Sequence, residues 1–241
     1  MKIISLVPSI TEALFDFGLS ENEIIGRTKF CIHPENLVQK IEIIGGTKNL
    51  NLDKIKALNP DLIIANKEEN VKEQIEELQK DFKVLVTNIS NLEDNYYLLK
   101  TLGNLLGKQE IAQKFNLKIY EILAKFSDLE KKKCAYLIWK NPYMTVGFDT
   151  FIHDILDKIG FQNIFKNQKR YPEVSVEDLK AADYIFLSSE PFPFQQKHID
   201  ELQKELPDAK IFLVDGEAFS WYGTRLAKCE SYFQNLVQNC R

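Results

Sequence analysis

The chain has 241 residues, of which 44% are hydrophobic and 27% charged, a composition typical of a globular protein with one large domain or two smaller lobes. A formal net charge of −4 argues against a nucleic-acid-binding protein, which would usually carry a basic stripe. The cysteines at positions 31, 134, 229 and 240 show no paired spacing, so a disulfide framework is not expected.

The N-terminal stretch MKIISLVPSITEALF predicts a buried strand at Ile3–Val7 followed by a helix. It has neither the charged and apolar regions nor the cleavage site of a secretory signal peptide. No apolar run approaches the roughly 18 residues needed for a membrane span. The sequence as written therefore predicts a cytoplasmic protein that does not span a membrane. A periplasmic or cell-surface location is the alternative if an export signal has been removed.

A cysteine and a histidine stand two residues apart in the stretch RTKFCIHPENL (residues 27–37). Pro34 favours an extended backbone at His33, which would point His33 and Cys31 to the same side. One interpretation is local packing for Cys31 with a local hydrogen bond for His33. The other is a pocket wall that touches the ligand, including an axial ligand to a bound metal complex.

A metal ion held by the protein itself needs three or four ligands, and the other histidines are badly placed for this. His153 does not join the apolar face of its helix, and His198 is expected on a surface helix. A catalytic pair is also disfavoured, because no third residue is visible that would orient Cys31 and His33.

Two segments of the chain share one order of parts: helix, aspartate, strand, glutamate-bearing turn, helix, strand. The first is NLDKIKALNPDLIIANKEEN followed by EQIEELQKDFKVLVT, and the second is SVEDLKAADYIFLSSEPF followed by KHIDELQKELPDAKIFLVD. Short apolar runs predict buried parallel strands at Ile3–Val7, Leu62–Ala65, Lys83–Val86, Ala135–Trp139, Tyr184–Leu187 and Ile211–Val214. Capping-box helix starts are predicted at Ser9 with Glu12, Ser90 with Glu93, and Ser175 with Asp178. The repeat predicts an α/β fold of two Rossmann-like lobes with parallel sheets.

A long helix is predicted between the lobes, over residues 108–131. Apolar residues recur there at spacings of four and three without Gly or Pro, which indicates one helix of about 23 residues, roughly 35 Å long. The expected domains are an N-terminal lobe (1–107), this connecting backbone helix (108–131) and a C-terminal lobe (132–241). A stiff connector would leave a ligand cleft between the lobes largely pre-formed.

Ligands of α/β lobes bind outside the carboxyl ends of the strands, and the loops there are rich in aromatic residues and proline. Exposed loop aromatics are typical of a binding surface, although ordinary packing is the alternative for each. Arg225 is expected to face an anionic group of the ligand, with an ion pair to Glu217 or Glu190 as the alternative. The candidate ligand-binding residues are Pro8, Phe30, Cys31, His33, Asn66, Tyr143, Tyr171, Glu190, Phe192, Glu217, Trp221, Tyr222 and Arg225.

The chain resembles the helical-backbone substrate-binding proteins of ABC importers, and the cobalamin- and iron-siderophore-binding branch looks closest. The residues that carry the resemblance are KIISLVPSITEALFDFGL, PDLIIA, YLIWKNPYMTVGFDTFIHDIL, NIF and YPEVSVEDL. It implies a bulky metal-chelating ligand held between the lobes with little hinge motion. It also implies that acidic residues of each lobe dock to arginines of a membrane permease. Glu68 and Glu69 are candidates for this docking, with stabilisation of a helix N-terminus as the alternative.

The expected function is that of a solute-binding protein, not an enzyme, for a corrinoid, haem or siderophore ligand in ABC-type uptake. No cofactor is required, since the metal chelate is the ligand itself. The expected partners are this small molecule and an ABC permease, with no nucleic acid, and the chain is expected to be a monomer. The alternative is a cytoplasmic protein of the same fold that handles a cofactor or metal complex without a transporter.

Overall fold

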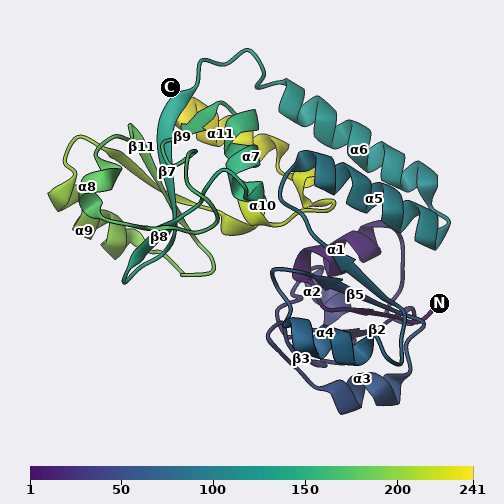
Figure 1. The fold of residues 1–241 in the computed structure, drawn as a ribbon. Coiled ribbons are helices and arrows are strands. Elements are labelled where there is room, and N and C mark those ends of the chain that lie inside the picture. The colour runs from purple at the N-terminus through teal and green to yellow at the C-terminus, as the bar shows by residue number, and fades with distance from the viewer. Residues whose placement is uncertain (241) are drawn as a thin grey trace. The chain divides into compact units, whose positions relative to one another are not determined.

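The computed structural model describes residues 1–240, which form two compact α/β units (Figure 1). Unit 1 comprises Met1–Ile89, Asp94–Asn116 and Tyr222–Arg225. Unit 2 comprises Ser90–Glu93, Leu117–Trp221 and the segment from Leu226 onward. The α/β class with two lobes is thus confirmed. None of the helices within residues 1–240 is long and apolar enough to cross a membrane.

The sheet of unit 1 has four parallel strands in the order β2-β1-β5-β6. These strands are β1 (Ile3–Ser5), β2 (Ile24–Arg27), β5 (Leu62–Asn66) and β6 (Val84–Thr87). The other elements up to β6 are α1 (Pro8–Asp16), α2 (Glu35–Val38), the antiparallel pair β3 (Gly45–Gly46) and β4 (Asn49–Leu50), α3 (Leu52–Leu58) and α4 (Lys72–Leu78). The central strands β1 and β5 are fully buried, as expected for a parallel sheet covered by helices. β6 is an edge strand, so the prediction that it is buried was wrong for residues such as Val86.

The sheet of unit 2 is mixed, in the order β10-β8-β7-β11-β12, with β9 paired to β7 beside β8. Its predicted strands are β7 (Lys132–Trp139), β11 (Tyr184–Ser188) and β12 (Lys210–Val214), which are parallel to one another. The sequence did not indicate β8 (Tyr143–Thr145), β9 (Phe161–Asn163) or β10 (Glu173–Val174). The helices are α7 (Phe151–Lys158), α8 (Val176–Leu179), α9 (Gln196–Glu205), α10 (Gly216–Ser220), the 3-10 turn η1 (Arg225–Lys228) and α11 (Glu230–Asn239). The edge strand β12, like β6, is only partly buried.

The internal repeat corresponds to one β–α–β arrangement in each unit. In unit 1, β5 continues through α4 to the parallel edge strand β6, and in unit 2, β11 continues through α9 to β12. The strand order β1-β5-β6 therefore matches β7-β11-β12. Because the carboxyl ends of parallel strands lie at one edge of a sheet, the turns after β5 and β11 occupy equivalent places in their units.

The helix predicted over residues 108–131 is shorter than expected. α6 runs from Gln109 to Ala124, 16 residues, and lies beside α5 (Leu92–Leu106) (Figure 1). The Ser127 hydroxyl donates to the carbonyl of Ala124 at 2.9 Å and so takes an acceptor at the helix end. Phe126 continues the apolar spacing of α6 and is buried, but it lies in the turn that follows the helix. Unit 1 extends along α6 to Asn116, and the chain returns to this unit for Tyr222–Arg225.

Candidate ligand-binding site

The loop after β2 exposes one aromatic ring of unit 1. Phe30 is 49% exposed, and the ammonium of Lys29 lies 5.0 Å from its ring centroid. A Cβ on Gly46 would stand 3.4 Å from this ring, so the backbone of β3 lies against the Phe30 side chain. Pro8, half-exposed, opens α1 directly after β1. Both residues leave apolar surface for a ligand, and their roles as contacts remain predictions.

Cys31 is packed in the core of unit 1. Its side chain has 0% exposure, and the Thr11 hydroxyl donates to Sγ at 3.0 Å. Burial raises the pKa of the Cys31 thiol, so the thiolate that a nucleophile or metal ligand requires is disfavoured. Cys31 is therefore a packing residue, as one of the two interpretations had it, and has no exposed surface that could form a pocket wall. His33 is half-buried. Within residues 1–240, no group of three or more His, Cys, Asp and Glu side chains is arranged to hold a metal ion.

Asn66 is buried and closes the turn between β5 and α4. Its Oδ1 accepts the backbone N–H of Glu68 at 2.8 Å and that of Glu69 at 3.3 Å. Its Nδ2 donates to the Thr87 hydroxyl on β6, and its own N–H donates to Asn70 Oδ1 at 2.8 Å. The Asn66 side-chain amide, which was predicted to meet the ligand, thus forms its hydrogen bonds with the backbone of the turn and with Thr87. What the turn presents instead is the half-exposed pair Glu68 and Glu69.

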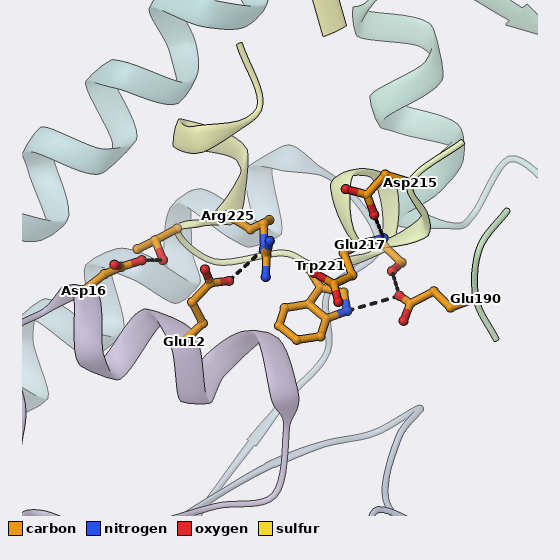
Figure 2. A network of polar contacts seen from close by, with 9 residues as sticks. Glu12, Asp16, Glu190, Asp215, Glu217, Trp221 and Arg225 are labelled. Atoms are coloured by element: carbon orange, nitrogen blue, oxygen red, sulfur yellow. Dashed lines mark hydrogen bonds and ion pairs between the residues drawn. The ribbon is translucent and has the colours of Figure 1, made fainter. Parts of the chain in front are cut away.

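Four consecutive residues, Tyr222 to Arg225, are each bonded by a side chain of unit 1. Tyr222, which is buried, donates its hydroxyl to Glu69 at 3.2 Å, and the Asn95 amide bonds both backbone groups of Gly223. The Thr224 hydroxyl donates to Asp16 at 2.5 Å. Arg225 Nε lies 2.8 Å from Glu12 Oε2, and both side chains are largely buried (Figure 2).

Arg225 was predicted to face the ligand or to pair with Glu217 or Glu190, and Glu12 was not considered as its partner. Glu12 had been interpreted as half of a capping box with Ser9. The structure has no side-chain cap at the start of α1, and the Glu12 carboxylate pairs with Arg225 instead. A buried ion pair of this kind fixes the returning segment to α1 and breaks only at a high cost.

In unit 2 the turn after β11 brings Glu190 against the loop after β12 (Figure 2). Glu190 Oε1 accepts the Ser220 hydroxyl at 2.6 Å and the Trp221 indole N–H at 3.1 Å. Burial raises the pKa of the Glu190 carboxyl, and the negative charges of Glu217 and Asp215 raise it further. A Cβ on Gly216 would stand 2.5 Å from Glu190 Cγ, so only glycine permits this approach. Glu190, Glu217 and Trp221 therefore lie close together in unit 2, and their roles as ligand contacts stay predictions.

A second cluster of unit 2 consists of aromatic rings at the carboxyl end of β7. Trp139, 41% exposed, meets Phe192 edge-to-face with 5.8 Å between the ring centroids. Phe192 in turn contacts Phe194 and His198 at 4.8 and 5.4 Å. Half-buried Tyr143 packs against the core of unit 2, as Phe192 does, and Tyr171, also half-buried, lies under the Arg170 guanidinium.

Sequence reasoning did not select Trp139 as a candidate ligand contact, because it was assigned to the buried strand. It is the last residue of β7, and the last residue of a parallel strand is a position where ligands are met, which is the signal that could have identified it. His198 was placed on the surface of its helix, but the structure buries its ring.

These features together are those of a protein that binds small molecules. Each unit carries aromatic and acidic side chains at the carboxyl ends of its parallel strands, where α/β folds bind small molecules. Rings such as Phe30 and Trp139 offer apolar surface, and carboxylates such as Glu217 accept hydrogen bonds. The arrangement suits recognition of a small molecule with both apolar faces and polar substituents.

The model of the periplasmic binding protein family matches residues 3–209, so the chain belongs to this family of solute-binding proteins. A vitamin B12-binding protein of Vibrio vulnificus is 28% identical over 195 residues, which covers 78% of this chain and 71% of the relative. The periplasmic vitamin B12 binding protein of Vibrio cholerae has a similar structure, with a TM-score of 0.80 at 19% identity, covering 98% of this chain and 97% of that one. A periplasmic heme binding protein from Pseudomonas aeruginosa gives a TM-score of 0.83 at 20% identity over 98% of this chain and 91% of that one. These structural similarities establish the fold, and the family establishes solute binding as the function.

Proposed function

We propose that the solute bound by this chain is a corrinoid, carried for an ABC-type importer. The observation that carries the proposal is the pairing, in unit 2, of an exposed aromatic platform with a group of carboxylates. Trp139 and Phe192 supply the platform, and Glu190, Glu217 and Asp215 supply the carboxylates. The vitamin B12-binding relatives at 28% identity support the same ligand class.

The charge of this group favours a corrinoid over haem or an anionic siderophore. A corrinoid presents a broad apolar ring edged by neutral amides, whose N–H groups donate to carboxylates. Haem carries propionates and catecholate siderophores carry anionic oxygens, which the negative charges around Glu190 would repel. The chelated metal enters as cargo, so no resident cofactor is proposed.

Delivery to a permease is the second part of the proposal, and it implies a location at the outer face of the cytoplasmic membrane. The family supports this context. Glu68 and Glu69 are the proposed docking groups of unit 1. Glu69 also accepts the Tyr222 hydroxyl, which holds this turn against the returning segment Tyr222–Arg225.

Titration of the purified protein with cobalamin, cobinamide, haem and ferric siderophores tests the ligand class. We expect saturable binding of a corrinoid, seen as a change in its visible absorption. Trp139→Ala should weaken it by about 2 kcal/mol, roughly thirtyfold in Kd, because an aromatic residue at the centre of a site carries much of the binding energy.

Tyr120→Ala is the matched control, since Tyr120 is an aromatic residue exposed on α6, away from any strand end. It should bind like the unmodified protein. Tight binding of haem with no corrinoid binding would reject the corrinoid proposal, and equal losses in Trp139→Ala and Tyr120→Ala would reject the role of the platform.

A further inference from the structure

The imidazole of His198 caps the helix that follows the Glu190 turn. His198 is the third residue of α9 (Gln196–Glu205), and its Nδ1 accepts the backbone N–H of Gln195 at 2.8 Å. The Gln195 side chain in turn accepts from the backbone of His198, which makes a reciprocal capping box. Glu or Gln is the usual residue at this third position because its side chain is an acceptor. A histidine can do the same only while Nδ1 carries no proton.

The contact therefore fixes the protonation state of the ring. An imidazole that accepts at Nδ1 is neutral and holds its proton on Nε2. In the imidazolium both nitrogens are donors, so protonation would set an N–H against the N–H of Gln195. The cap is then lost, and the part-buried backbone N–H of Gln195 loses its partner.

The same ring supports the aromatic cluster. His198 is 5% exposed, and its centroid lies 5.4 Å from that of Phe192 and 5.5 Å from that of Phe194. Phe192 reaches Trp139, and its backbone N–H donates to the carbonyl of Ile138 on β7. The orientation of Phe192 against Trp139 thus depends on a ring that must stay neutral to keep its own hydrogen bond.

The charges that face His198 come from two elements, and most of them oppose its protonation. Lys140, in the turn after β7, and Lys197, on α9, both disfavour a second positive charge. Glu201, one turn along α9, would favour it, but its carboxylate forms an ion pair with Lys140. Burial is the largest cause that lowers the pKa of His198 below its ordinary value, and the two lysines add to it.

We propose that His198 is a positioning residue for the Trp139–Phe192 platform, and that its protonation releases the platform and weakens ligand binding in acid. The part concerning ligand affinity rests on the proposed function. The part concerning the loop is a property of unit 2 alone and does not need a ligand.

The variant that separates titration from packing is His198→Asn. The Asn amide oxygen can take the place of Nδ1 as acceptor for the Gln195 N–H, and it has no proton to gain near neutral pH. His153→Asn is the matched control, because His153 is a half-buried histidine of unit 2 that lies on α7, outside the cluster. It changes a titrating histidine to the same residue elsewhere in the unit.

Two measurements test the inference. In the ligand-free protein, imidazole nitrogen NMR should show His198 as the Nε2–H tautomer, and hydrogen exchange of the Gln195 amide should accelerate relative to its intrinsic rate as His198 takes up a proton. With cobinamide, Kd should rise by about fivefold between about pH 7.5 and about pH 5, which corresponds to the loss of one part-buried hydrogen bond. His198→Asn should lose this acid response, and His153→Asn should keep it.

An Nδ1–H tautomer, or Gln195 exchange that does not follow the titration of His198, would overturn the inference without any ligand. An undiminished acid response in His198→Asn would overturn its ligand part, because the response would then come from another group such as Glu190. If no ligand of the panel binds, the proposed function fails, and the two ligand-free measurements still decide the role of His198.

Discussion

The turn after β5 and the turn after β11 occupy equivalent places in the two units but are held by different chemistry. The first is held by neutral amides: Asn66 accepts from the backbone of Glu68 and Glu69, and Asn70 accepts from Asn66. The second is held by groups that can change charge, since Glu190 accepts from Ser220 and Trp221 and the imidazole of His198 caps the next helix. An amide keeps its hydrogen-bonding pattern at every physiological pH, whereas a carboxyl and an imidazole do not.

The difference separates a fixed turn from an adjustable one. The Asn70 amide also reaches the carbonyls of Leu6 and Thr47, so it ties the turn to β1 and to the β3–β4 hairpin. The turn in unit 2 instead carries Phe192, one of the two rings proposed to meet the ligand. The charged Glu68 and Glu69 stand on the fixed turn and Phe192 on the adjustable one, which suits a docking role for the former and a ligand-responsive role for the latter.

The largest expected effect comes from removing the amide at the fixed turn. Asn70→Ala strips hydrogen bonds from the N–H of Asn66 and from the carbonyls of Leu6 and Thr47 in a buried place. We expect it to lower the free energy of unfolding by about 2–4 kcal/mol, because buried polar groups lose their partners. Urea unfolding followed by circular dichroism measures this loss, which should be equal at pH 5 and pH 7.5.

Asn88→Ala is the control, since Asn88 is an exposed asparagine of unit 1, and it should change stability by less than about 0.5 kcal/mol. A loss in Asn70→Ala that varied strongly with pH would contradict the description of this turn as insensitive to charge. Trp139 and Trp221 both belong to unit 2, so their fluorescence reports separately whether that unit is affected.

How much of this structure the sequence predicts depends on how far apart in the chain the interacting residues lie. The repeat with its two Glu-bearing turns, and most strand positions, followed from local apolar runs and were confirmed in both units. β8 and β10 were missed because they are short and have no apolar run of their own. The length of α6 was overestimated because Phe126, which is buried in the turn after the helix, has the spacing of a helical residue.

The predicted capping boxes also show that local patterns fail where a distant residue competes for a side chain. The motif at Ser175 and Asp178 was confirmed in full, because both partners lie within one turn of chain. Ser9 with Glu12 has an equally suitable pattern, but Arg225 provides a stronger partner for Glu12. Asn95 likewise bonds Gly223 across 128 residues of chain. Contacts between residues so far apart in the sequence form only in the folded chain. No local sequence pattern could therefore predict that the segment around Tyr222 is anchored to unit 1.

A smaller effect, of opposite sign to the first, is expected at the adjustable turn. The folded-state pKa of Glu190 is raised, so its protonated form is favoured by folding. That stability is fully present below the unfolded-state pKa of about 4.3 and is lost as pH rises through the folded-state value. Glu190→Gln keeps the acceptor oxygen and removes the charge, so it should be more stable than the unmodified protein at pH 8 and lose this advantage near pH 4.

Urea unfolding across this pH range measures the crossing, and Glu205→Gln, at an exposed position on α9, should show no such pH-dependent gain. If Glu190→Gln were instead less stable at pH 8, the Glu190 carboxylate would be stabilising the turn as a charge. The contrast between a fixed and an adjustable turn would then rest on His198 alone.

The smallest effect concerns Lys140, whose ion pair with Glu201 sits at the surface and contributes at most about 1 kcal/mol. Lys140→Gln removes a positive charge that faces His198 and releases Glu201, and both changes raise the pKa of His198. Because the folded-state pKa of His198 is lowered, its contribution to stability is present above the unfolded-state value of about 6.5 and is lost as pH falls. A folded-state pKa closer to the unfolded one makes that loss smaller.

NMR titration of the imidazole should therefore give a higher midpoint in Lys140→Gln, together with a shallower acid loss of stability. Lys180→Gln is the control, since Lys180 pairs with Glu177 near α8 and should leave the His198 titration unchanged. An unchanged midpoint in Lys140→Gln would mean that burial alone keeps His198 neutral. The adjustable turn would then depend on packing of the rings around His198 rather than on the charges near it, and Lys140 would have no part in its response to pH.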